Sequence, residues 1–293
     1  MSLSGVISSP YQRKLFIFTS SLIISVSIIV SWVLYYITPE TRGWNIIIDF
    51  LVAIVASATF ALVSAMYIAF FFRDPFEIAS AVKILPQDID QTLIQMAQKA
   101  TDYKLFVRTG RHFRAEILPV LIKSAERSRR PVRIEVILLD FRADEICERY
   151  ANYRKNASFD GSLWTKKYVQ KEILATIMSL IDAASTHNSL VSVNLYLSRR
   201  LSTFRIDGSS DEIIITREDP KDIASRYRRD DSDYSAFLSE FAWIRDEAVK
   251  MKAGNGKSSL PTTVADMFDG CQLVEALSAE AADAKSERSP YAR

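Results

Sequence analysis

The stretch LFVRTGRHFRAEILPVLIKSAERSRRPVRIEVILLD, residues 105–140, predicts a strand, a helix and a second strand in succession. Residues 104–110 form a short apolar run that closes on Gly110, and residues 114–130 carry apolar side chains at helical spacing. Residues 132–140 alternate and then become continuously apolar, which is typical of a buried strand. The stretch therefore predicts a β-α-β unit, and with it an α/β sheet domain.

The chain that follows continues the alternation of helices and strands. Apolar spacing predicts helices at 144–154, 163–184 and 237–251, and a strand at 190–197. Residues 201–219, LSTFRIDGSSDEIIITRED, predict two short strands around a turn, which makes the sheet mixed. The charged segment 226–233 predicts a solvated turn between helices. We therefore predict a mixed α/β domain over residues 104–251.

Two apolar runs precede this domain. Residues 15–37 hold no charged side chain and residues 46–72 hold only Asp49, and both runs exceed the roughly 20 residues needed to cross a bilayer. The sequence thus predicts a membrane protein with a two-helix transmembrane hairpin. The remaining segments are predicted as a cytosolic N-terminus at 1–14, a connector with one helix at 73–103, and a disordered tail at 252–293.

The charges that flank the two runs predict the orientation of the hairpin. Arg13 and Lys14 precede the first run and Arg73 and Lys83 follow the second, whereas the loop between them holds one arginine, Arg42, and one glutamate, Glu40. Positive charge favours the cytoplasmic side, so both termini should be cytoplasmic, with the hairpin in the inner membrane. The two cysteines are far apart and give no disulfide or metal signature, and we expect no cofactor.

Small residues recur at every fourth position of the second run, and such stripes let helices approach closely. The stripe consists of Ala53, Ser57, Ala61, Ala65 and Ala69. It predicts either packing within the hairpin or packing between protomers of a homo-oligomer that opens a pore. Asp49 lies about one turn from the outer loop, so its side chain is expected to reach interfacial water.

Arginines gather where the first predicted strand ends and its helix begins. This edge of an α/β sheet is where ligands bind, and guanidinium groups suit phosphate because their planar forks bind it bidentately. The predicted anion site consists of Arg108, Arg111, Arg114, Arg205 and Asp207. The alternative is that these arginines form surface ion pairs with Asp211, Glu212 or Asp140.

Residues 105–140 and 201–216 resemble the first β-α-β unit and the later hairpin of phospholipase D-like domains. In that family a His-x-Lys strand runs on to an Asp-Gly pair. With Asp207 at the family's aspartate, Arg200 stands in place of the histidine and Ser202 in place of the lysine. The family's chemistry needs two histidines, one as nucleophile and one as acid. The resemblance therefore implies a degenerate phospholipase D-like domain without catalysis.

The whole layout resembles the two-transmembrane effectors of bacterial anti-phage systems, particularly retron systems. There a reverse transcriptase and its RNA–DNA product restrain a membrane toxin until phage attack. The resemblance implies membrane damage and growth arrest on activation, with the soluble domain as the sensing or restraint surface. A nucleotide or a nucleic acid is the expected ligand of this domain. The alternatives are a membrane-anchored phospholipase D-like phosphodiesterase and a non-enzymatic signalling or scaffold protein.

Overall fold

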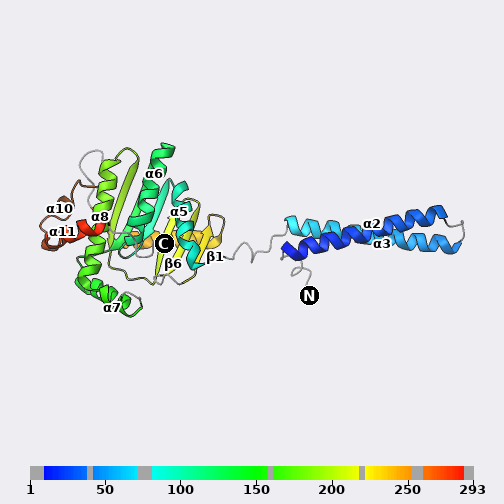
Figure 1. The fold of residues 1–293 in the computed structure, drawn as a ribbon, viewed down its shortest axis with the longest axis horizontal. Helices are drawn as coiled ribbons and strands as arrows, with labels where there is room; N and C mark the ends of the chain where they lie inside the picture. Colours follow the sequence, from blue (N-terminus) through cyan, green and yellow to red (C-terminus); the bar gives the residue numbers. More distant parts are fainter. Residues whose placement is uncertain are drawn as a thin grey trace. The chain divides into compact units, whose positions relative to one another are not determined.

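The computed structural model describes residues 10–37, 42–71, 81–157, 161–217, 222–251 and 260–286. The chain divides into two compact units, Met1–Ser80 and Ala81–Arg293, and each is described by itself. The first contains two long apolar helices, and the second is an α/β domain with a mixed sheet (Figure 1).

The two helices of the first unit are α2, Pro10–Ile37, and α3, Arg42–Phe71, and they pack side by side (Figure 1). Their most apolar windows, Phe18–Ile37 and Asn45–Ser64, have mean hydropathies of 2.0 and 2.6. Only 6% and 0% of these windows are buried, whereas the core helix of a soluble protein would be mostly buried. The helices are therefore long and apolar enough to cross a bilayer.

The face of α3 that packs against α2 is not the face that carries the small-residue stripe. On α2 the side turned toward its partner carries Ser27, which is 9% exposed, and Ser31, whose Oγ is buried. On α3, by contrast, Ala53, Ser57 and Ala61 are all exposed. The interpretation that this stripe packs within the hairpin is therefore wrong for these three residues, because the serines of α2 supply the small side chains at the contact. The side chains of Ala65 and Ala69 lie outside the described part of the structure.

In the second unit, eight strands of the described residues form one sheet in the order β1-β7-β6-β5-β2-β3-β4-β8. Strands β2, β3 and β4 run parallel and their neighbours are antiparallel, as a mixed sheet requires. The strands are β1 Val82–Ile84, β2 Asp102–Phe106, β3 Val132–Leu139, β4 Val191–Ser198, β5 Phe204–Ser209, β6 Glu212–Arg217, β7 Ala224–Arg228 and β8 Val249–Lys250. The predicted β-α-β unit and the 201–219 hairpin are both present.

Helices cover the two faces of the sheet unequally. Helices α5, α6 and α8 contribute Leu93, Leu121 and Ile173 to the larger core, and α9 contributes Phe241 to a smaller core on the other face. The bounds are α5 Ile89–Lys99, α6 Leu118–Ser128, α7 Asp144–Ala157, α8 Lys166–Thr186 and α9 Ser232–Glu247, with short 3-10 turns at Pro86–Asp88 and Gly161–Leu163.

Three segment predictions need correction. Part of the predicted connector belongs to the domain, because β1 pairs with β7 and α5 packs against α6; residues 72–80 lie outside the described residues. The segment 226–233 was predicted as a turn, but its first residues complete β7, since Arg226 pairs with Ile214 of β6.

The predicted disordered tail is also folded over much of its length. It forms α10, Val264–Met267, and α11, Gln272–Lys285, and α11 packs along α8 (Figure 1). Val274, Leu277, Ala281 and Ala284 of α11 are buried. Their spacing of three or four residues gives α11 one narrow apolar face, and its small alanines allow a close approach to α8.

The turn between β2 and α6 depends on Gly110. Its φ is +72°, a left-handed conformation, and a Cβ at this position would lie 2.8 Å from Cγ2 of Thr176 on α8. The chain then forms a π-helical turn, Phe113–Ile117, in which the N–H of Leu118 donates to the carbonyl of Phe113. Pro119 follows in the first turn of α6, where its missing N–H is tolerated.

We expect Gly110→Ala to lower the free energy of unfolding by about 2–4 kcal/mol, because it combines a left-handed backbone with a clash against α8. Gly270→Ala is the matched control: Gly270 has a φ of +71°, but among the described residues beyond its chain neighbours no atom lies within 4 Å of the position that a Cβ would take. It should cost only about 1–2 kcal/mol. Urea unfolding of the full chain in detergent measures both, and equal costs would contradict the tight contact with Thr176.

Candidate functional site

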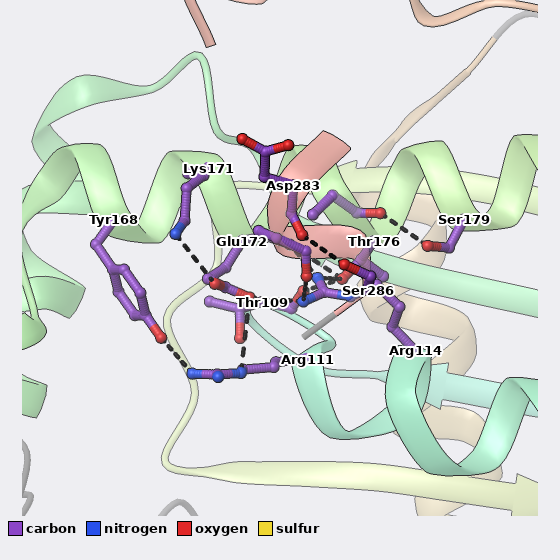
Figure 2. Close-up of polar contacts among 12 residues, drawn as sticks. Thr109, Arg111, Arg114, Tyr168, Lys171, Glu172, Thr176, Ser179, Asp283 and Ser286 are labelled. Carbon is purple, nitrogen blue, oxygen red and sulfur yellow. Dashed lines mark hydrogen bonds and ion pairs between the residues drawn. The ribbon is translucent and has the colours of Figure 1, made fainter. Parts of the chain in front are cut away.

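A buried ion pair lies where the π-helical turn meets α8 (Figure 2). Nη2 of Arg114 donates to Oε2 of Glu172 at 2.9 Å, and both side chains are only 1% exposed. Nη1 of the same arginine donates to the Glu172 carbonyl at 3.0 Å and to Oγ1 of Thr176 at 3.1 Å. The Thr176 hydroxyl in turn donates to the carbonyl of Thr109 at 2.7 Å. This network ties the end of β2 to α8.

Two further cations surround the carboxylate of Glu172 (Figure 2). Nζ of Lys171 lies 3.8 Å from Oε1, and Nε of Arg111 lies 4.0 Å from Oε2. Tyr168 lies beside both: its hydroxyl accepts a hydrogen bond from Arg111, and its ring lies 5.0 Å from the Lys171 Nζ. We call Arg111, Arg114, Tyr168, Lys171 and Glu172 the Glu172 cluster.

The end of α11 covers one side of the Glu172 cluster. The carbonyl of Ala284 accepts a hydrogen bond of 3.0 Å from Nη2 of Arg114. A carbonyl at a helix C-terminus carries partial negative charge, so it stabilises the buried guanidinium. Two surface ion pairs fix α11 along α8: Lys167 with Glu280 at 2.6 Å, and Lys285 with Asp182.

Arg205 and Asp207 lie in a separate network on the hairpin strand β5. Arg205 donates to both oxygens of Asp207, at 2.9 and 3.2 Å, and the hydroxyl of Tyr103 donates to Oδ1 at 2.9 Å. Asp207 is fully buried. Burial, and then the Asp207 carboxylate, raise the pKa of Tyr103 well above its ordinary value, so the phenol remains a donor to Asp207.

His112 packs against the start of α5. Its Nε2 lies 3.2 Å from Oδ1 of Asp90. The contact with His112 is the largest cause that lowers the pKa of Asp90, with a smaller contribution from Arg205, against partial desolvation that raises it. This pair anchors α5 to the turn after β2.

Arg108 lies on the face of the sheet opposite to the one that carries Arg205 and Asp207. It is 2% exposed, and its guanidinium carbon lies 6.0 Å from the ring centroid of Phe106, which belongs to the smaller core beneath α9. Arg205 and Asp207 instead share the face of Tyr103 and the larger core.

The five residues predicted to form one anion site are therefore divided among three places. Arg111 and Arg114 come together at Glu172, Arg205 bonds Asp207, and Arg108 lies across the sheet. A single site built from all five is not what the structure contains. The predicted alternative, in which these arginines form ion pairs, agrees better with the structure. Their acidic partners are Glu172 and Asp207, however, rather than the predicted Asp211, Glu212 or Asp140. Most of these pairs are buried and not on the surface.

Sequence reasoning missed Glu172, although a signal for it was present. Glu172 follows Val169 by three residues and precedes Thr176 by four, so it lies on the buried face of α8. An acidic side chain on an apolar helix face needs a buried cation as its partner. Arg114, on the neighbouring predicted helix, was the matching candidate.

The positions that correspond to the phospholipase D motif have structural partners. Arg200 donates to Glu240 at 2.7 Å, and the Ser202 hydroxyl accepts from the N–H of Phe204 at 3.3 Å. The two histidines lie at opposite ends of the parallel strands. His112 follows the carboxyl end of β2, whereas His187 precedes the first residue of the parallel strand β4 and lies 3.2 Å from Glu126. Among the described residues, no three metal-ligating side chains gather into a cluster.

No protein-family model matches the sequence, and no curated protein matches it. Among solved structures, the chain is similar to TrmBL2, an archaeal chromatin protein whose structure shows a novel mode of DNA binding. The alignment has 13% sequence identity, covers 71% of this chain and 67% of that chain, and has a TM-score of 0.35. A likeness at this level carries no argument about the function of this chain.

Proposed function

We propose that this protein is a membrane-embedded effector of an antiviral defence system, which impairs the inner membrane when partner components release it. In this proposal α2 and α3 cross the bilayer as a hairpin with both termini in the cytoplasm, and copies of the chain associate into a homo-oligomer. The α/β unit is the surface through which a reverse transcriptase and its RNA–DNA product hold the effector inactive.

The observation that carries the proposal is the exposure of the hairpin. Bulky side chains such as Phe18, Phe50 and Phe60 are 67%, 65% and 75% exposed, and apolar side chains continue around both helices. An apolar surface of this extent is unfavourable in water and suits a lipid environment. The exposed small stripe at Ala53, Ser57 and Ala61 gives this surface a place where a second hairpin can approach closely.

The rival proposal is a membrane-anchored phospholipase D-like phosphodiesterase. It requires two histidines that act on one phosphate. His112 and His187 lie at opposite ends of the parallel strands. Each contacts an acidic residue of a neighbouring helix: His112 contacts Asp90, and His187 contacts Glu126. This geometry favours the effector over the enzyme.

The test is to induce the protein in a bacterial host, alone and together with its neighbouring genes, and to follow entry of a membrane-impermeant dye. We expect dye entry and growth arrest on induction alone, and protection when the partners are present. A His112→Ala/His187→Ala double variant should be as toxic as the original chain. Loss of toxicity in that variant, when it is still inserted and folded, would support the enzyme instead.

A further inference from the structure

A pocket of about 340 Å³ lies between the end of α5 and the strands β6 and β7. Its volume is at the lower end of the range of small-molecule sites. Met96 of α5 and Ser209 at the end of β5 line it, and they are 2% and 4% exposed. Most of the other side chains that line it are charged, and cations outnumber acids among them. The pocket therefore combines a buried, partly apolar wall with a charged rim.

Hydrogen bonds hold the two turns that border the pocket. The hydroxyl of Ser209 accepts from the N–H groups of Asp211 and Glu212, both at 3.2 Å. The Tyr234 hydroxyl of α9 donates to the Ser209 carbonyl at 2.9 Å. The N–H of Arg229 donates to the carbonyl of Asp211 at 2.8 Å. These bonds fix the turn between β5 and β6 and join it to the end of β7, so the pocket is formed before a ligand binds, as small-molecule sites usually are.

Ion pairing across β6 and β7 leaves one arginine of the rim without a carboxylate. Arg228 stands opposite Glu212 in the strand register, but the Glu212 carboxylate accepts from the neighbouring Arg226 instead. Within the described part of the chain, the side chains of Lys99, Arg228 and Arg229 form no ion pair. Three cations of the rim are thus available to an anionic ligand.

The rim suits a phosphate ester whose body carries hydrogen-bond donors. Arg228 and Arg229 offer planar forks for phosphate oxygens, and Lys99 offers a point charge. Asp211 and Asp230 also line the pocket and, among the described residues, take part in no ion pair, so their carboxylates can accept from hydroxyl or amino groups. A nucleotide carries both kinds of group, and its flat base suits the apolar wall from α5.

We propose that this pocket binds a nucleotide, with Lys99, Arg228 and Arg229 at its phosphate and the two aspartates at its hydroxyl or amino groups. The nucleotide binds between elements of the α/β unit alone. A role for it in restraint or release rests on the proposed function, but the binding itself does not.

The test is isothermal titration calorimetry on the full chain in detergent. The probes are adenosine monophosphate and uridine monophosphate, with adenosine and inorganic phosphate as separate parts of a nucleotide. We expect at least one nucleotide to bind, and to bind more tightly than either part. Arg228→Gln and Arg229→Gln should each weaken nucleotide binding about tenfold, as the loss of one charge-assisted contact does. The structural hydrogen bonds of both arginines come from their backbone N–H groups, which glutamine keeps.

Arg127→Gln is the matched control, because Arg127 is an exposed arginine of α6 that does not line the pocket. Its variant should bind as the original chain does. Three results overturn the proposal: neither nucleotide binds at millimolar concentration, inorganic phosphate binds as tightly as the nucleotides, or Arg127→Gln weakens binding as much as the pocket variants do. Melting temperatures show that each variant is folded. Nucleotide binding in a chain that does not permeabilise cells would support this inference and contradict the proposed function.

Discussion

Replacing Arg114 by alanine is expected to lower the free energy of unfolding of the α/β unit by about 3–5 kcal/mol. The substitution removes the cation at 2.9 Å from Glu172, a carboxylate that is 1% exposed, and leaves the carbonyl of Ala284 at the end of α11 without its donor. A buried charge that loses its partner has neither water nor a counter-charge close by. Lys171 and Arg111 remain at 3.8 and 4.0 Å, which places the expected cost toward the lower end of that range.

The measurement is urea unfolding of the full chain in detergent, with hydrogen exchange of α8 amides to report on the α/β unit alone. Arg133→Ala is the control: Arg133 is 59% exposed and lies 3.6 Å from Asp102 and from Glu135. It should cost less than about 1 kcal/mol, since exposed ion pairs contribute little. The double variant Arg114→Met/Glu172→Met should recover much of the loss, because it removes both charges. An Arg114→Ala cost no larger than that of Arg133→Ala would contradict a buried, mutually dependent pair.

The order of elements in the α/β unit was predictable because its strands and helices carry strong periodic patterns. Residues 105–140 alternate or cluster their apolar side chains so clearly that β2, α6 and β3 follow from them. The unit extends beyond the predicted bounds 104–251 at both ends, because the added elements carry only weak periodic patterns. The strand β1 has three residues, and α11 buries mainly alanines, so neither produces a strong local signal.

The candidate site was predictable in its residue types but not in its grouping. Arg108, Arg111 and Arg114 are close in sequence, yet Arg108 belongs to a strand extension, where side chains alternate between the faces of the sheet. It therefore lies across the sheet from Arg205. The grouping around Glu172 depends on how α8 packs against the turn at Gly110, a contact between residues more than sixty positions apart. Local periodicity carries no information about such contacts.

The largest functional effect is expected from leucine at Ser57 or Ala61 in α3. Both residues are exposed, on a side of the helix that α2 does not cover, so a larger side chain leaves the hairpin contact intact. Lipid gives apolar helices no hydrophobic reason to associate, and close packing along small residues then decides whether they do. Leucine is well tolerated by the bilayer, so insertion should be preserved. We expect these variants to accumulate in the membrane normally and to reduce dye entry on induction to the level of uninduced cells.

Ala56→Leu separates the stripe from a general effect of added bulk. Ala56 is also exposed, but it lies about 100° around the helix from Ser57 and farther from Ala61. A leucine there adds the same volume outside the line along which two hairpins would approach, so dye entry and growth arrest should persist. If Ser57→Leu and Ala61→Leu permeabilise cells as fully as Ala56→Leu does, close helix approach along this stripe is not the toxic step. The hairpin would then serve as an anchor, and the activity would have to lie in the α/β unit, where the Glu172 cluster is the first site to test.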